Sequence, residues 1–313
     1  MKLLLPDAIP LHPIVPDGVT TVVFDVTSPI PHEHRDAEAI VLWGSSRDRL
    51  ATLPDELPHL SWIQGLMAGT DGVHAAGFSP DVTITSGRGL HDLPVAEHTL
   101  GLILAAARRF DLAFAAQAEH RWDGGIGGNQ ANPTTTRFST LRGAHVLIWG
   151  FGGIGQQLAQ YLSALGAHVT GVATTAGERL GYRVVTDEDL ADELARTDVL
   201  VDILPALEGT AHVVDAEILA ALPRHAWFVN VGRGATVDED ALVAALADGT
   251  IAGAALDVFS HEPLPADSPL WDAPNLIITP HSAGGRPQES EGLIEENLRR
   301  YLAGTELLNV TAG

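Results

Sequence analysis

The sequence contains no cysteine and only one lysine, and both absences remove whole classes of chemistry. Without cysteine there is no disulfide, no thiolate nucleophile and no zinc–thiolate site. With Lys2 as the only lysine, Schiff-base chemistry has no candidate elsewhere in the chain. Cysteine chemistry is therefore excluded, as is Schiff-base chemistry at any residue other than Lys2.

Basic residues are also scarce, with 18 Lys and Arg against 40 Asp and Glu, for a formal net charge of −22. Nucleic acids and anionic membranes bind basic surfaces, so neither is an expected partner. An anionic substrate would be repelled at long range. Its site must therefore be built locally, from arginine and backbone N–H groups.

Long apolar runs are missing as well. No run approaches the roughly 20 residues that a membrane span requires. The stretch MKLLLPDAIPL (1–11) is broken by Pro6 and makes a poor signal peptide, so we expect a cytoplasmic protein. The 313 residues, 45% hydrophobic and 5% aromatic, suit two globular domains of the α/β class.

Apolar runs and helical patterns alternate along the chain. Strands are predicted at 21–26, 39–44, 60–65 and 81–87, and then at 145–149, 168–172, 199–204, 227–231, 252–258 and 275–279. Helices are predicted at 93–110, 187–196, 237–249 and 289–302, and a surface loop at 124–133. The continuous apolar strands suit parallel sheets covered on both faces, which predicts doubly wound sheets. The helix at 93–110 is apolar nearly all round, so we expect it to be buried between domains.

Gly150, Gly152 and Gly155 form the pattern G-x-G-x-x-G directly after a predicted strand and at the start of a predicted helix. The first glycine permits a tight turn, the second lets the backbone approach a diphosphate, and the third lets the helix pack on the strand. The N–H groups at the helix start and its positive dipole end favour an anion. The context predicts a dinucleotide-binding site.

The acidic residue that usually follows the second strand of such a site is missing. It should lie near Ala173, after HVTGV, where the sequence continues ATT. Without this carboxylate nothing repels a 2′-phosphate, and Thr174 and Thr175 could donate hydrogen bonds to one. Glu178 and Arg179 follow and act in opposite directions. We therefore favour NADP over NAD, the alternative being that the acid is simply lost and NAD is held more loosely.

Three further stretches, FVNVGRGATVDEDAL (228–242), AALDVFSHEPLP (254–265) and NLIITPHSAG (275–284), resemble the D-isomer-specific 2-hydroxyacid dehydrogenases. The stretches 93–109, 141–159 and 202–214 resemble the same family, which includes glyoxylate/hydroxypyruvate reductases and phosphoglycerate dehydrogenases. Six motifs thus follow in the family's order. The resemblance is specific for the family and not for the substrate.

The resemblance implies three catalytic residues for the reduction of a 2-keto acid. Arg233 matches the arginine whose fork holds the carboxylate and the ketone oxygen. His281 matches the acid–base histidine, and Glu262 matches the carboxylate that orients the imidazole and favours its protonated form. The chemistry needs such a set, because the carboxylate must be clamped, the ketone polarised and a proton delivered as the hydride arrives.

The resemblance also implies binding residues. Asp257 corresponds to the residue that hydrogen-bonds the nicotinamide carboxamide, and the stretch 67–73 resembles the loop whose N–H groups hold the substrate carboxylate. The predicted substrate-binding set is Ala68, Gly69, Thr70 and Arg233. The predicted cofactor-binding set is Gly150, Gly152, Gly153, Ile154, Gly155, Thr174, Thr175, Pro205, Thr210, Val231, Asp257 and His281.

The resemblance completes the predicted architecture. A Rossmann dinucleotide-binding domain (99–285) is expected as an insertion in a flavodoxin-like substrate domain (1–98 with 286–313). The substrate, a small anionic 2-keto or 2-hydroxy acid of glyoxylate or hydroxypyruvate type, is expected between the domains. A homodimer is expected, formed through the cofactor domain.

Other residues and another function compete with these predictions. His261 is the nearest competitor to His281, but it is treated as a bystander. A metal site at 31–36, where His32 and His34 stand two apart, is less favoured than a solvated loop, and no metal is expected. The rival function is a dinucleotide-sensing binding protein of the corepressor kind on the same scaffold. Nothing in the sequence requires this function, because the full set of catalytic residues is present.

Overall fold

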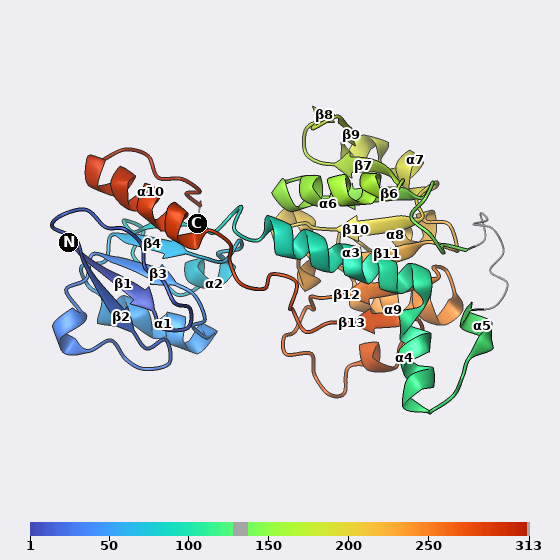
Figure 1. Cartoon of the computed structure of the whole chain (residues 1–313), viewed down its shortest axis with the longest axis horizontal. Helices are drawn as coiled ribbons and strands as arrows, with labels where there is room; N and C mark the ends of the chain where they lie inside the picture. The colour runs from blue at the N-terminus through green and yellow to red at the C-terminus, as the bar shows by residue number, and fades with distance from the viewer. Residues whose placement is uncertain (128–136, 312–313) are drawn as a thin grey trace. The chain divides into compact units, whose positions relative to one another are not determined.

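The computed structural model describes residues 1–127 and 137–311 (Figure 1). The chain divides into two compact units, residues 1–91 with 286–313 and residues 92–285. The boundary predicted between residues 98 and 99 stays a prediction, and both residues lie inside helix α3 (Asp92–Arg108). Of the loop predicted at 124–133, the first four residues form helix α5 (Gly124–Gly127), and 128–133 lie outside the described residues.

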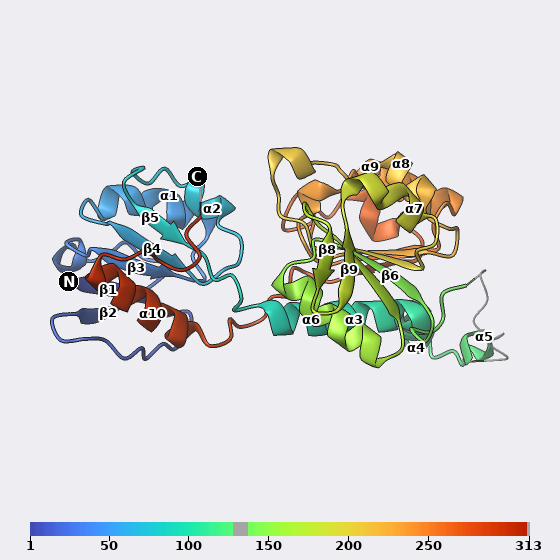
Figure 2. The same cartoon turned by 90° about the horizontal axis from the view of Figure 1, so that it is seen from above.

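The first unit is built on a five-stranded parallel sheet in the order β2-β1-β3-β4-β5. Its strands are β1 (Lys2–Pro6), β2 (Thr20–Phe24), β3 (Ala39–Leu42), β4 (Trp62–Gly65) and β5 (Thr83–Thr85). Its helices are η1 (His32–His34), α1 (Arg47–Glu56), α2 (Asp71–His74) and α10 (Ser290–Ala303). Leu50 and Leu53 of α1 pack on one face, and Ile294 and Leu298 of α10 pack on the other (Figures 1 and 2).

Strand β1 was not among the predicted strands. Its leucines Leu3 and Leu4 are wholly buried, and it pairs with both β2 and β3. The short run MKLLLP, which we assessed only as a signal peptide, is thus an inner strand of the first sheet.

The second unit carries an eight-stranded sheet in the order β13-β12-β11-β10-β6-β7-β9-β8. The strands are β6 (His145–Trp149), β7 (His168–Val172), β8 (Gly177–Arg179), β9 (Tyr182–Val185), β10 (Val199–Asp202), β11 (Trp227–Asn230), β12 (Gly253–Leu256) and β13 (Leu276–Ile278). All neighbours are parallel except β8 and β9, which form an antiparallel hairpin at the sheet edge. This hairpin was not predicted.

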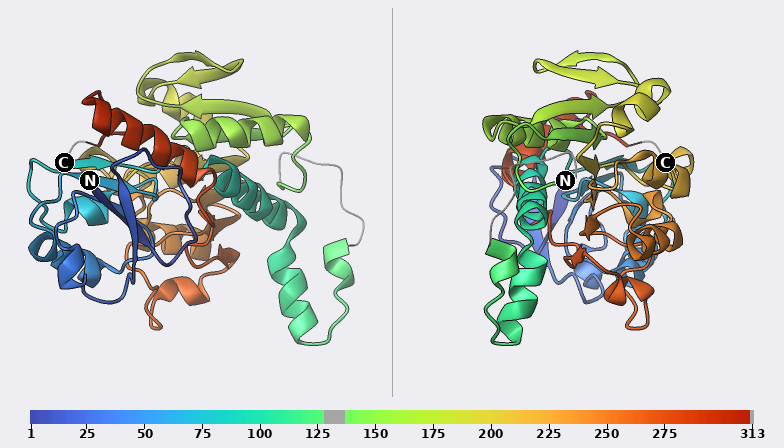
Figure 3. Two further views of the ribbon diagram at one scale, coloured as in Figure 1. Left: turned by 60° about the vertical axis from the view of Figure 1, so that its left-hand side comes forward. Right: turned by 90° about the vertical axis from the view of Figure 1, so that its right-hand side faces the viewer.

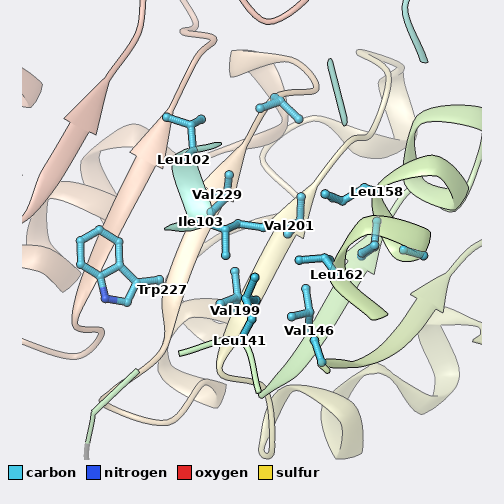
Figure 4. Close-up of a cluster of buried hydrophobic side chains, with 14 of the residues drawn as sticks. Leu102, Ile103, Leu141, Val146, Leu158, Leu162, Val199, Val201, Trp227 and Val229 are labelled. Atoms are coloured by element: carbon cyan, nitrogen blue, oxygen red, sulfur yellow. The ribbon is translucent and has the colours of Figure 1, made fainter. Parts of the chain in front are cut away.

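Helices cover both faces of this sheet (Figure 2). They are α3, α4 (Phe110–Ala118), α5, α6 (Gly153–Ala164), η2 (Asp187–Asp189), α7 (Leu190–Leu194), η3 (Glu208–Thr210), α8 (Ala216–Ala221), η4 (Gly234–Thr236), α9 (Glu239–Asp248) and η5 (Pro269–Asp272). Figure 4 shows one core layer, in which α3 and α6 side chains meet the valines of the central strands. Helices α7, α8 and α9 contribute leucines to the opposite layer.

The predicted fold class is confirmed. The first sheet has the flavodoxin-like strand order 2-1-3-4-5. The second, counted from β6 without the hairpin strand β8, has the Rossmann order 3-2-1-4-5-6 followed by one further strand. None of the helices formed by residues 1–127 and 137–311 has the length and apolar character needed to cross a membrane.

Helix α3 is not buried on all sides, although its apolar sequence suggested that it would be. Val95, Leu102 and Ile103 are buried, whereas Leu93 and Leu104 are exposed at 49% and 36%. The buried positions recur at helical spacing and face the sheet of the second unit. One stripe of α3 therefore stays open within this unit.

Candidate active site

The three residues predicted to be catalytic follow three consecutive strands of the second sheet. Arg233 follows β11, Glu262 lies in the loop after β12, and His281 follows β13. These strands are neighbours and parallel, so their carboxyl ends meet at one edge of the sheet. Ligands of open α/β sheets bind at this edge.

His281 stands in a backbone turn that few non-glycine residues adopt, with φ +49°. The turn is fixed by Asp257, whose carbonyl oxygen accepts a hydrogen bond from the His281 amide at 2.7 Å. The Asp257 carboxylate accepts the next two amides, those of Ser282 and Ala283, both at 2.9 Å. Asp257 thus holds the imidazole-bearing turn in place.

Asp257 is only 1% exposed, and its carboxylate also accepts the Thr279 hydroxyl at 2.6 Å. Burial would raise the pKa of Asp257, but the hydrogen bonds from His98, Thr279 and the two amides lower it below its usual range. Asp257 is therefore ionised at neutral pH. Its predicted contact with the nicotinamide carboxamide stays a prediction.

Glu262 and His281 form a direct pair, with Glu262 Oε2 2.7 Å from His281 Nδ1. The other carboxylate oxygen, Oε1, accepts the Phe259 amide at 3.0 Å, which fixes its orientation. A carboxylate at Nδ1 keeps that nitrogen protonated and leaves Nε2 as the group available to a substrate. The geometry is that of an oriented acid–base imidazole.

Arg233 lies in a turn that packs against the Glu262 loop. A Cβ at Gly234 would come within 1.9 Å of the Phe259 carbonyl carbon, so only glycine permits this contact. The Arg233 carbonyl accepts the Asn230 side-chain amide at 3.0 Å, and its guanidinium donates to the Gly232 carbonyl at 2.8 Å. The structure therefore connects the loops that carry Arg233, Glu262 and His281.

The glycine loop between β6 and α6 has the form required for a diphosphate. Gly150 has φ +103°, and a Cβ there would meet the Ile203 carbonyl oxygen at 2.6 Å. Gly152 caps α6 without a side chain, and a Cβ at Gly155 would meet the Gly150 carbonyl at 2.8 Å. The residues thus fit a dinucleotide whose diphosphate lies at the start of α6, with Gly153 and Ile154 in its first turn.

Asp92 is a neighbour of this loop that the sequence analysis missed. A Cβ at Gly153 would lie 2.1 Å from Asp92 Oδ2, so the first residue of α3 lies against the first turn of α6. A carboxylate is electrostatically favoured at a helix start. No sequence signal indicated this contact, because 61 positions separate the two residues.

The end of β7 carries no acid. Thr174 and Thr175 are exposed, and Arg179 reaches back from the β8–β9 hairpin toward them. Its guanidinium donates to the Phe151 carbonyl in the glycine loop at 2.9 Å and to the Thr175 carbonyl at 3.3 Å. A cation is thereby fixed beside the position where a ribose-binding acid usually lies.

The remaining predicted cofactor residues are found on the loop after β10 and at the end of β11. Thr210 donates its hydroxyl to the Pro205 carbonyl at 2.6 Å, which ties the two ends of the loop together. Val231 is buried directly after β11. A Cβ at Gly232 would meet the Leu204 carbonyl at 2.6 Å, so the loops after β10 and β11 are in backbone contact.

The predicted substrate loop belongs to the first unit. Ala68, Gly69 and Thr70 follow β4, and the Thr70 carbonyl accepts the amides of Val73 and His74 in α2, at 2.9 and 3.0 Å. Among the residues that the structure describes, no hydrogen bond uses the amides of these three residues. Three adjacent amides thus remain available to an anion.

A cavity of about 490 Å³ in the second unit lies beside the Glu262–His281 pair. Beside Glu262 and His281 it is lined by Phe259, Pro263, Leu264, Trp271, Ile278 and Pro280. The Trp271 indole is held by the Pro265 carbonyl at 2.8 Å. The imidazole–carboxylate pair therefore borders a largely apolar wall.

The competing sites do not join this arrangement. His261 is exposed, and no hydrogen bond of its side chain appears among the described residues. His32 and His34 lie in η1 of the first unit. In the described parts of the chain, no group of three His, Cys, Asp or Glu side chains is placed to hold a metal ion.

Comparisons with known proteins agree with one another. Residues 100–283 match the family model of the D-isomer specific 2-hydroxyacid dehydrogenase, NAD binding domain. The chain is 30% identical to glyoxylate/hydroxypyruvate reductase A HPR2 of Arabidopsis thaliana, over 88% of this chain and 86% of that protein. It is 35% identical, over 70% of its length, to the D-3-phosphoglycerate dehydrogenase of Mycobacterium tuberculosis, but spans only 41% of that protein.

Two solved structures are similar over nearly their whole length. A D-isomer specific 2-hydroxyacid dehydrogenase family protein from Aeromonas salmonicida matches with a TM-score of 0.83 and 30% identity, covering 99% of this chain and 98% of that one. The NADPH-dependent glyoxylate/hydroxypyruvate reductase SmGhrA of Sinorhizobium meliloti, in complex with NADP and sulfate, matches with a TM-score of 0.81 and 26% identity. The coverage in that case is 99% of this chain and 98% of the other.

Proposed function

The chain belongs to the D-isomer specific 2-hydroxyacid dehydrogenases, and from this premise we propose that it reduces a small 2-keto acid of glyoxylate or hydroxypyruvate type with NADPH. The observation that carries the proposal is the 2.7 Å Glu262–His281 pair at the strand edge that also bears Arg233. The relatives support a dehydrogenase and not the binding-protein alternative. The relatives are named for different acids, among them glyoxylate, hydroxypyruvate and phosphoglycerate, so an assay must identify the acid that this enzyme reduces.

The proposed mechanism assigns one task to each residue. Arg233 and the amides of 68–70 hold the carboxylate, and Arg233 also polarises the ketone oxygen. His281 donates a proton from Nε2 to that oxygen, while Glu262 stabilises the imidazolium. The nicotinamide supplies the hydride to the carbonyl carbon when bound. In the reverse direction, neutral His281 takes the proton back.

The direct test measures NADPH and NADH consumption with glyoxylate, hydroxypyruvate, pyruvate and a bulkier 2-keto acid. Turnover of at least one small acid is expected, because the apolar wall and the arginine suit a short acid with a carboxylate. Cofactor binding without turnover of any 2-keto acid would contradict the proposal and favour the sensor alternative.

The preference for NADPH rests on charge at the end of β7. No carboxylate repels a 2′-phosphate there, and Arg179 is fixed to the Phe151 and Thr175 carbonyls close by. Thr174 and Thr175 add hydroxyl donors. The similar S. meliloti reductase is named NADPH-dependent.

Replacing Arg179 by glutamine is expected to raise the KM for NADPH by about tenfold or more, because one charge-assisted phosphate contact is lost. The KM for NADH should change little. Arg183→Gln is the matched control, since Arg183 lies in the same hairpin but pairs with Glu193. Equal effects of Arg179→Gln on both cofactors would show that Arg179 does not contact the phosphate.

The proposed homodimer uses the open side of α3 and α4. Leu93 and Leu104 of α3 are exposed, as are Phe110, Leu112 and Phe114 of α4. In the described part of the chain, Ala116 is the one buried residue of α4, and Figure 3 shows α4 extending beyond the sheet of its unit. An apolar helix so exposed fits a second copy of this chain.

The substitution Phe114→Glu places a charge on the exposed apolar side of α4. It is therefore expected to convert the dimer to a monomer, as measured by analytical ultracentrifugation. Ile14→Glu is the control, because Ile14 is 81% exposed in the other unit. A wild-type protein that sediments as a monomer would remove the dimer proposal. The cytoplasmic location stays a prediction from the sequence.

A further inference from the structure

Asp202 ends strand β10 with a fully buried carboxyl group that none of the roles above includes. Its Oδ1 accepts the Leu204 amide at 2.8 Å. Its Oδ2 lies 2.5 Å from the Thr236 hydroxyl oxygen, which in turn lies 2.6 Å from the Arg233 carbonyl oxygen. Three oxygen atoms therefore form a continuous line from β10 to the backbone of the substrate-binding arginine.

The line requires two hydrogen atoms. Oxygen–oxygen distances of 2.5 and 2.6 Å are hydrogen-bond lengths, and each needs one hydrogen between the two atoms. The Thr236 hydroxyl supplies one, and a backbone carbonyl supplies none. Asp202 supplies the other if its carboxyl group is a neutral acid. It then donates to Thr236, and Thr236 donates to the Arg233 carbonyl.

The surroundings of Asp202 favour the neutral acid. In the described structure, its partners in register on the adjacent strands β6 and β11 are Trp149 and Asn230, neither of which titrates, and η4 presents Thr236. The charged residues that flank these segments are Asp198 before β10, Glu208 after it and Arg233 at the start of η4. Burial raises the pKa of Asp202 to about 7, against the opposing hydrogen bonds from Thr236 and Leu204.

We propose that Asp202 is a positioning residue that carries a proton in the active enzyme and, through the Thr236 hydroxyl, fixes the turn that presents Arg233. When Asp202 ionises, the Thr236 hydroxyl turns to the carboxylate and the Arg233 carbonyl loses that donor. Asn230 Nδ2, at 3.0 Å, and the Thr236 amide, at 3.2 Å, then remain. The turn loosens, and the grip on the substrate carboxylate weakens.

The inference rests on the proposed function only for the task given to Arg233; the proton on Asp202 is independent of it. Asp202→Asn tests the proposal, because an amide donates to Thr236 at every pH. The KM of the wild type for glyoxylate is expected to rise several-fold as the pH passes about 7. The pH dependence of kcat is expected to reflect the proton donor His281 instead. In Asp202→Asn this rise should be absent, with KM matching the wild type within about twofold near pH 6.

Thr236 provides the matched control. Thr236→Val interrupts the line and should raise KM at every pH, while Thr236→Ser should restore the wild-type profile. Superimposable KM profiles of the wild type and Asp202→Asn would overturn the proposal. So would an Asp202→Asn enzyme as impaired near pH 6 as Thr236→Val.

Two readouts do not depend on turnover. An infrared carboxylic-acid band should be present in the wild type below about pH 7, fade above it, and be missing in Asp202→Asn. The denaturation midpoint of the wild type should fall relative to that of Asp202→Asn as the pH rises toward about 7, because the folded state binds the extra proton. If no keto acid is reduced but the band is found, the proposed function fails and the proton assignment stands. A missing band overturns the assignment, even if Asp202→Asn does not fold.

Discussion

Replacing Arg233 by glutamine is expected to lower kcat/KM for 2-keto acid reduction about a thousandfold. Glutamine has a similar reach but no charge and no fork, so it can neither clamp a carboxylate in bidentate fashion nor stabilise the negative charge that develops on the ketone oxygen. The largest part of the loss should appear in kcat if the ketone contact strengthens in the transition state.

Binding of NADPH, measured by fluorescence titration, should change little in this variant. The glycine loop and the β8–β9 hairpin, which are proposed to bind the nucleotide, lie at other strands of the sheet. Arg233→Lys is the matched control. It keeps the charge but loses the planar fork, so an intermediate loss is expected. A rate for Arg233→Gln within about tenfold of the wild type would exclude Arg233 as the substrate clamp.

Replacing His281 by asparagine is expected to lower the rate of reduction by about 10²–10⁴-fold, the usual contribution of a positioned general acid. The wild-type reduction rate should fall as the pH rises through the range in which the imidazole loses its proton, since reduction needs the protonated form. Oxidation of the 2-hydroxy acid should rise over the same range. The variant should have lost both dependences, leaving a low and flat profile.

The substitution Glu262→Gln tests how much the carboxylate of Glu262 adds to the catalytic effect of the His281 imidazole. The amide can still accept a hydrogen bond from Nδ1, so the rate of reduction should fall less than in His281→Asn. A wild-type rate that stays constant from neutral to alkaline pH at saturating cofactor would exclude His281 as the proton donor.

The architecture was predictable because it depends on local patterns. The runs that became β6, β7, β10, β11 and β12 are rich in apolar residues, as is typical of parallel strands covered on both faces. The segments that failed prediction lack such a pattern. Strand β1 has only three consecutive leucines between Lys2 and Pro6, and the hairpin 177–185 mixes charged, glycine and apolar residues. Helix α3 was expected to be buried between domains because it is apolar nearly all round, and such a helix does not reveal which of its sides the sheet covers.

The candidate site divides in the same way. Its main residues each stand in a recognisable stretch, and the structure carries them to adjoining strand ends. Asp202 had no such signal, since one acid within VLVDIL is unremarkable until Thr236 is seen beside it, 34 positions along the chain. Arg179 was noticed but could not be placed, because its importance depends on a reversal of the chain at 180–181. Contacts made by long-range folding are not encoded in short motifs.

The β8–β9 hairpin has a consequence for how this enzyme can change. It lies at one end of the second sheet, whereas the strands leading to Glu262 and His281 lie at the other. The groups proposed to distinguish the two nucleotides, Thr174, Thr175 and Arg179, all fall within the six positions 174–179, at and just before the start of the hairpin. On this proposal, one short segment carries the choice of electron donor. Exchange of that segment alone could move the enzyme from one cellular pool of reducing equivalents to the other while the acid chemistry stays intact.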